Sequence, residues 1–247
     1  MGCSGSNALG QFTKKYYNEP QKFTAQYNFA AGEENELFTA KFKSFRHTNC
    51  LVKIDDKEYK AENAETFKLK VGAGEHKIEI ELKFNEGIET MDSMFEGNEG
   101  LVSIDLTNFG LKHLKSLKNV FCGCKNLKTV TMKPDTDVSM CEDFSNMFAG
   151  CSSLETIELS SWNIAAVANT TSMFEGCTNL KTADISKWDL SKVPPASCAK
   201  MFANCPALTG FEEIVKKNDK GMFDADLVAK VGDAADPNAQ PALEDRA

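Results

Sequence analysis

The fold is decided by a stretch that the chain repeats: residues 147–162 read MFAGCSSLETIELSSW, and residues 173–188 read MFEGCTNLKTADISKW. Both copies open with Met-Phe-x-Gly-Cys and continue into an apolar run of the form Leu-x-x-(Ile/Ala)-x-(Leu/Ile). Related copies begin at Met94, Val120 and Met201. Successive copies start 26 to 28 residues apart, which falls inside the roughly 20–29-residue period of leucine-rich repeats.

A unit of this length cannot bury its own apolar face, whereas stacked units bury a continuous core. The alternating apolar runs are typical of strands, and the remainder of each unit has room for turns or short helices. The extra residues in the longer spacings fall at Pro134 and at Pro194-Pro195, which indicates loop insertions. The sequence therefore predicts an α/β leucine-rich-repeat solenoid of four to five coils over residues 90–210, with parallel strands and short helices or turns.

The repeated pattern, read at Met147–Trp162 and Met173–Trp188, resembles the BspA-type leucine-rich repeat. The resemblance covers residues 91–210. Two copies depart from it, because Asn98 stands in the cysteine slot of the first and the second lacks the Ser-x-Trp ending. BspA-type repeats occur in bacterial surface proteins and in some protist proteins, so the resemblance implies adhesion or protein recognition and carries no catalytic residues to this chain.

Four cysteines occupy one slot in successive copies, namely Cys124, Cys151, Cys177 and Cys205. Stacking would bring their sulfur atoms near one another, as a disulfide or a metal site requires. The simpler interpretation is internal packing, because free cysteine is a small side chain that is very often buried. Cys122-x-Cys124 also has poor spacing for a zinc pair. We therefore expect core cysteines and no metal.

The N-terminal half shows period-two alternation, which marks strands with one buried face. The alternating runs lie at 23–29, 38–42, 50–54, 67–71 and 78–84. They predict a small antiparallel β-sandwich over residues 21–86, Ig-like in general form. One interpretation makes this unit a second binding module; the favoured one makes it a spacer that covers the end of the solenoid. Residues 211–247 are expected to form a helical cap and a disordered tail.

Residues 1–20 read as a flexible tether that opens with Met-Gly-Cys-Ser-Gly-Ser. This matches the myristoylation pattern, and Cys3 beside Gly2 would accept palmitate. One acyl chain anchors a protein only marginally, whereas two hold it stably. Gly2 and Cys3 are therefore predicted lipidation sites that place the chain on the cytoplasmic face of a membrane. The alternative is a bacterial cell-surface lipoprotein that is acylated on Cys3.

The composition restricts the function further. A net charge of −8 argues against nucleic acid as a partner. The chain has three histidines and lacks the common motifs of metalloproteases, hydrolases, nucleotide-binding loops and dinucleotide-binding folds. We therefore predict no enzymatic activity, no catalytic residues and no cofactor. No run of 18 apolar residues occurs, so no transmembrane helix is expected.

The predicted strands carry three rows of outward-facing residues across the coils. Charged residues alternate in the first row and threonines fill most of the second. The third row consists of Asp105, Thr131, Glu158 and Asp184. Like charges on neighbouring strands repel each other unless a cation compensates, so we interpret this row as a candidate contact surface for a basic protein partner. The simpler alternative is a solvated acidic face.

Together these features predict a non-enzymatic protein-binding scaffold that a lipid anchor tethers to a membrane. Two other functions stay open. The chain would serve equally as a structural subunit of a larger assembly, or as a bacterial surface adhesin lipoprotein.

Overall fold

The computed structural model describes residues 21–30, 37–39, 41, 48–55, 57–61, 73–84, 89–212, 214–215, 221–225 and 228–229; for residues 48–50, 60–61 and 83–84 it describes the backbone alone. The predicted tether at 1–20, the strand expected at 67–71 and the tail expected from 232 lie outside these ranges. The strands in the described part are β1 (Gln21–Phe29), β2 (Thr48–Ile54), β3 (Lys57–Ala61), β4 (Gly74–Phe84), β5 (Leu101–Asp105), β6 (Thr129–Thr131), β7 (Thr156–Glu158) and β8 (Thr182–Asp184). One short 3-10 helix, η3 (Pro195–Ser197), follows β8.

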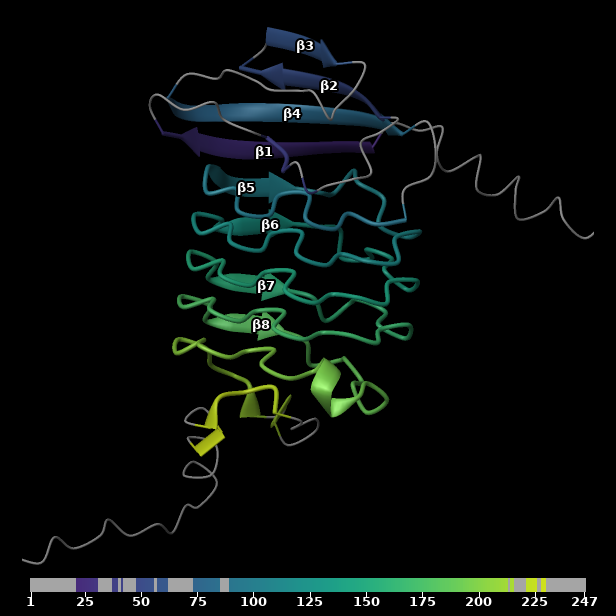
Figure 1. Ribbon diagram of the computed structural model, residues 1–247, viewed down its shortest axis with the longest axis vertical. Coiled ribbons are helices and arrows are strands. Elements are labelled where there is room, and N and C mark those ends of the chain that lie inside the picture. Colours follow the sequence, from purple (N-terminus) through teal and green to yellow (C-terminus); the bar gives the residue numbers. More distant parts are fainter. Residues whose placement is uncertain are drawn as a thin grey trace, which may run out of the picture.

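The strands lie side by side in one row, from β3 at one end to β8 at the other (Figure 1). Six of them form one mixed sheet in the order β3-β2-β4-β1-β5-β6, and β7 pairs with β8 in a second sheet. β5–β6 and β7–β8 are parallel pairs, whereas β1 to β4 pair antiparallel.

Strand β1 joins the two halves of the chain. It pairs antiparallel with β4 on one edge and with β5 on the other, so that Ala25 faces both Ile78 and Ile104. Alternate residues of β1 are buried, because this face continues the core of the coils. The hydroxyl of Tyr27 donates a hydrogen bond to the Leu37 carbonyl at 3.1 Å. The N-terminal strands therefore extend the repeat sheet.

The predicted α/β leucine-rich-repeat solenoid preceded by a β-sandwich is wrong. The described residues form strands with almost no helix, and β5 and β6 belong to the mixed six-stranded sheet instead of closing a separate solenoid. Strands β1 to β4 are one layer of that same sheet and do not form two packed sheets. The physical reason is that β1 offers its second edge to β5, so the two halves share hydrogen bonds as well as apolar contacts.

Left-handed backbone positions explain why the Met-Phe-x-Gly-Cys segment that opens each repeat forms turns instead of helix. The φ angle is 54° at Asn146 and 73° at Gly150, and the equivalent residues of the neighbouring copies are also positive. Such residues interrupt a right-handed helix. Between them, backbone N–H groups bond across coils: Phe148 donates to the Met173 carbonyl at 2.8 Å and Gly150 to the Glu175 carbonyl at 2.7 Å.

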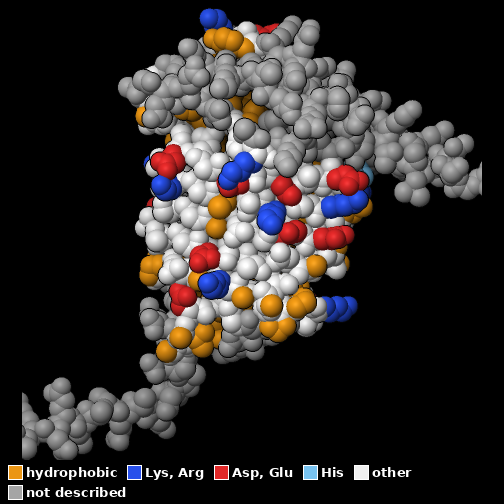
Figure 2. Space-filling view, in the orientation of Figure 1, with side chains coloured by type: hydrophobic (Ala, Val, Ile, Leu, Met, Phe, Trp, Pro, Cys, Tyr) orange, Lys and Arg blue, Asp and Glu red, His pale blue; other side chains and the backbone are white. Residues whose placement is uncertain are grey.

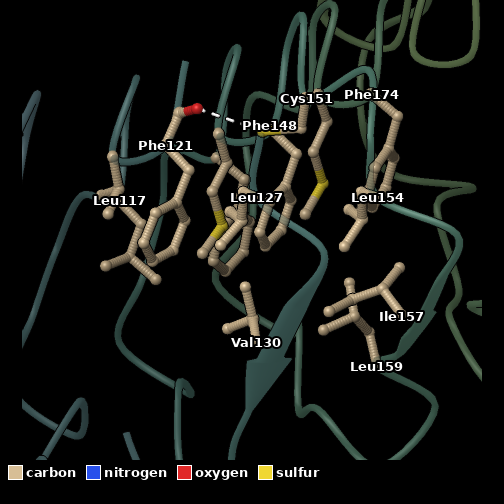
Figure 3. Close-up of a cluster of buried hydrophobic side chains, with 14 of the residues drawn as sticks. Leu117, Phe121, Leu127, Val130, Phe148, Cys151, Leu154, Ile157, Leu159 and Phe174 are labelled. Carbon is tan, nitrogen blue, oxygen red and sulfur yellow. Dashed lines mark hydrogen bonds between the residues drawn. The ribbon is translucent and has the colours of Figure 1, made fainter. Parts of the chain in front are cut away.

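A column of stacked phenylalanines passes through all the coils. It comprises Phe95, Phe121, Phe148, Phe174, Phe202 and Phe223, whose adjacent ring centroids are 5.2 to 5.5 Å apart. Neighbouring ring planes differ by at most 12°. Figure 3 shows three of these rings in a row above the side chains of the strands. Each phenylalanine is the second residue of a Met-Phe-type turn, so the sequence repeat and the column have the same period.

Both ends of the column are covered by residues that imitate a coil. At the N-terminal end Phe38 packs on Phe95, with centroids 5.8 Å apart, and the Asn98 amide donates to the Leu37 carbonyl at 3.2 Å. At the other end Met222-Phe223 acts as a sixth Met-Phe pair, because the Phe202 N–H donates to the Met222 carbonyl at 2.8 Å. Asn98 thus replaces cysteine where the preceding layer is not a regular coil.

The glycine of the repeat provides a stability test. An added Cβ at Gly150 would meet the Gly123 Cα at 3.6 Å, which is ordinary contact, so the cost of Gly150→Ala comes from its φ of 73°. We expect alanine to destabilise the fold by about 1–2 kcal/mol. Gly150→Asn should cost less, because asparagine tolerates this conformation and Asn204 adopts it at the equivalent position, with φ 57°. Urea unfolding measures both variants, and equal losses would contradict this explanation.

Candidate protein-binding surface

The four residues of the predicted acidic row lie at the ends of strands β5 to β8. Asp105 faces Thr131 in the β5–β6 pair, and Glu158 faces Asp184 in the β7–β8 pair. Asp105, Thr131 and Glu158 are exposed, and Asp184 is half-buried. The row is divided between the two sheets, because β6 and β7 do not pair. The structure therefore brings the four residues together as two pairs.

Each carboxylate of the row accepts a hydrogen bond from the backbone two residues further on. Asp105 Oδ1 accepts from the Thr107 N–H at 2.9 Å, Glu158 Oε1 from Ser160 at 2.8 Å, and Asp184 Oδ1 from Ser186 at 2.9 Å. Aspartate commonly makes such local bonds in turns. These bonds compensate part of each charge within the chain, so the closeness of Glu158 and Asp184 does not by itself require a basic partner.

The electrostatics of Asp184 agree with this local role. Hydrogen bonds from the Ser186 side chain and backbone lower the pKa of Asp184, while burial opposes the shift. The charge of Lys187 lowers it further. Asp184 therefore stays ionised at neutral pH because its own turn stabilises the carboxylate.

Other exposed charges are paired between neighbouring coils. Lys181 Nζ lies 2.6 Å from Glu155 Oε2, and Lys125 Nζ lies 2.6 Å from Glu99 Oε1. Lysine and acidic side chains are accordingly interspersed on the face that Figure 2 shows, with uncharged surface between them. Exposed pairs of this kind contribute little stability.

A hollow of about 280 Å³ lies where the N-terminal strands meet the first coil. Its wall includes Lys22 and Thr24 of β1, Leu51 and Lys53 of β2, Glu79 and Glu81 of β4, and Asp105 of β5. The register explains the grouping, since Lys53, Glu79, Thr24 and Asp105 face one another in turn across four adjacent strands. Asp105 is the residue of the predicted row that lines this hollow.

The cysteine slot lies inside the stack. Cys124, Cys151, Cys177 and Cys205 are fully buried. Each thiol donates a hydrogen bond to the carbonyl of the phenylalanine one coil before it; the sulfur–oxygen distances are 3.0 to 3.1 Å. Figure 3 marks one of these bonds with a dashed line. A free thiol donor thus links each coil to its predecessor.

The thiols are held in their protonated form. Burial raises the pKa of the Cys124 thiol to about 12 and that of Cys205 to about 11, and it raises the pKa of Cys151 and Cys177 as well. A protonated thiol keeps the hydrogen atom that it donates, whereas a thiolate would face the carbonyl oxygen with a negative charge. This arrangement is the opposite of the one that activates a nucleophilic cysteine.

The remaining predicted features have these positions. Gly2 and Cys3 lie outside the described residues. Among the described residues, no group of three or more histidine, cysteine, aspartate or glutamate side chains is placed to hold a metal ion. Within the same ranges, no helix has both the length and the apolar character needed to cross a bilayer.

Sequence reasoning did not identify the hollow. Thr24, Leu51, Lys53 and Glu79 were recognisable as outward-facing residues of alternating runs. What the runs do not contain is the strand order, which places β1 between β4 and β5. The Met222-Phe223 cap did have a signal, because it repeats the Met-Phe pair at the start of each copy.

Comparison with known proteins defines the family of the repeat region. The model of the family described as "Mycoplasma protein of unknown function, DUF285" matches residues 89–213, just over half of the chain. The chain belongs to the DUF285 family. No curated protein and no solved structure matches the chain significantly.

Buried thiols predict a loss of stability at alkaline pH. The pKa of Cys124 is 9.0 ordinarily and about 12 in the folded chain. As the pH rises, the Cys124 thiol of the unfolded chain therefore loses its proton at a lower pH than that of the folded chain. The contribution of this thiol to the free energy of unfolding is complete below pH 9 and is lost as the pH rises toward 12. Cys124→Ser keeps a donor that does not titrate in this range. The wild type should lose up to about 1.4 kcal/mol more than the variant per pH unit above 9.

Urea unfolding at pH 8 and pH 10 measures this difference, and lysine titration cancels because it is common to both proteins. An identical pH dependence of the two proteins would contradict the role assigned to the thiol.

Proposed function

We propose that the chain is a non-enzymatic protein-binding scaffold held at the cytoplasmic face of a membrane by acyl chains on Gly2 and Cys3. One observation carries the binding role. The buried phenylalanine and cysteine recur in successive coils, whereas the outward-facing strand positions of the first and third rows change from coil to coil. The framework therefore holds surface side chains in register without dictating their chemistry, which suits recognition of a protein surface.

The proposed partner is a protein with basic groups on its contact surface. A net charge of −8 supports this choice, because complementary potentials speed encounter and select partners. The carboxylates of Asp105, Glu158 and Asp184 lie at one end of their strands, where a partner would meet them. Their local hydrogen bonds hold each carboxylate in one orientation, which lowers the entropy lost on binding.

The family description favours one second candidate, a bacterial surface adhesin lipoprotein. DUF285 is described as a family of Mycoplasma proteins, and the BspA-type repeats that this sequence resembles occur in bacterial surface proteins. In this alternative the acyl group is carried by Cys3 and the coils face outward from the cell. A permanent structural subunit of a larger assembly is distinguished by size-exclusion of native extract, since an obligate subunit would not elute alone.

The lipid anchor has a direct test. Intact-mass spectrometry of the native protein should show loss of Met1 with added myristate and palmitate. The Cys3→Ser variant keeps one acyl chain, so it should move largely from the membrane to the soluble fraction, because one chain binds only marginally. A diacylglyceryl group on Cys3 would instead support the surface lipoprotein, and an unmodified N-terminus would remove both anchors.

The binding role is tested by photo-crosslinking in the native cell. A photoreactive amino acid replaces Thr156 or Thr182, which are exposed and paired on β7 and β8. Lys118 serves as a matched control, because it is equally exposed but lies in a turn outside the strands. We expect adducts of one mass from both strand positions and none from the control. Adducts at none of the positions, or equally at all three, would contradict the proposed sheet-face contact.

A further inference from the structure

We propose that the hollow beside Asp105 receives an arginine side chain of the partner protein. This inference rests on the proposed protein-binding function and names the contact within it. The hollow measures about 280 Å³, slightly less than the roughly 300–1,000 Å³ of pockets that hold small molecules and cofactors. Its size and open shape suit one long side chain from a second protein.

The charges of the hollow select a cation. Three carboxylates line it, and two of them already have lysine partners: Glu81 lies 2.9 Å from Lys22, and Glu79 lies 2.8 Å from Lys77. Asp105 has no ion-pair partner in the described part of the chain. Among the described lining residues, Asp105 is therefore the carboxylate that has no lysine paired with it. A cation from a partner protein would pair with Asp105 directly.

The carboxylate of Asp105 is oriented for this contact. Its Oδ1 accepts the Thr107 N–H at 2.9 Å, which fixes the carboxylate plane. No described residue donates to its Oδ2, so that oxygen is available to a partner. Arginine fits better than lysine, because a planar guanidinium donates two parallel hydrogen bonds to a carboxylate. The half-buried Leu51 and Thr24 offer an aliphatic and a hydroxyl wall to the methylene stem.

The site is built from both halves of the chain. Thr24 and Asp105 are direct neighbours across the β1–β5 pairing, and Thr24 also faces Glu79 of β4. The N-terminal strands thus contribute binding residues, beyond the role of a spacer that the sequence favoured for them. Glu158 and Asp184 lie on the second sheet and do not line this hollow. Of the three acids of the row, Asp105 is therefore the one that contributes to the proposed arginine site.

The experiment uses the full chain and three synthetic eight-residue peptides of threonine, serine and valine with one central arginine, lysine or citrulline. Citrulline has nearly the shape of arginine without its charge. Titration followed by backbone amide shifts should place the arginine peptide at Thr24, Leu51 and Asp105. Lysine should bind several-fold more weakly, and citrulline should cause no shift at these amides.

Two matched variants complete the test. Asp105→Asn removes the charge and keeps an oxygen for the Thr107 N–H, so it should fold normally and lose at least about tenfold in affinity for the arginine peptide. Asp184→Asn makes the same change at an equivalent turn away from the hollow and should bind like the wild type. Equal losses in both variants, equal binding of the citrulline peptide, or no binding of the arginine peptide would each overturn the proposal.

A failure of this inference is separate from a failure of the proposed function. If Asp105→Asn keeps the crosslinked adducts at Thr156 and Thr182 undiminished, the protein binds a partner without the hollow, and only the inference is wrong. If no adduct forms but the arginine peptide binds in the hollow, the binding site exists and the proposed sheet-face scaffold is wrong.

Discussion

The structure depends on one contact that recurs between successive coils at the Met-Phe-x-Gly-Cys turn. A phenyl ring stacks on the ring of the preceding coil, and the cysteine thiol donates to the carbonyl of that same preceding phenylalanine. The glycine between them supplies a left-handed residue, so the turn N–H groups point to the next coil instead of into a helix. Each internal coil makes this contact with the coil before it and with the coil after it. Replacing the phenylalanine, glycine or cysteine of one coil would therefore disturb both neighbouring coils.

The ends of the stack show how strongly this contact constrains the chain. Leu37 and Phe38 come from a segment far from the repeat, yet they present a carbonyl to Asn98 and a ring to Phe95 as a coil would. At the opposite end Met222 and Phe223 do the same for the last copy. A stack of identical layers would otherwise expose an apolar ring and unpaired backbone groups at each end. Both caps cover the end of the stack with a phenylalanine ring and a backbone carbonyl, the same two groups through which neighbouring coils contact each other.

The contact at the Met-Phe-x-Gly-Cys turn does not constrain the outward-facing side chains of the strands. Lys181 pairs with Glu155 across two coils, and local turn hydrogen bonds stabilise the carboxylates of Glu158 and Asp184. Asp105 differs from the equivalent acids because β1 lies beside it and the N-terminal strands form a hollow there. The candidate site is therefore a product of the junction between the two halves and is absent from the regular coils.

The sequence by itself determined the repeat, its period and the residues that face inward, because Phe148, Gly150 and Cys151 recur at positions where a regular stack requires them. It also predicted Asp105, Thr131, Glu158 and Asp184 as one row along the strand ends, which the structure divides into two pairs. Only the tertiary structure decided that turns replace helices and that β1 pairs with β5. Apolar alternation shows which face of a strand is buried, but both edges of a strand have the same backbone groups, so the pattern cannot tell which strand lies next to it. The family resemblance, the acyl anchor and the binding function stay predictions that the experiments above address.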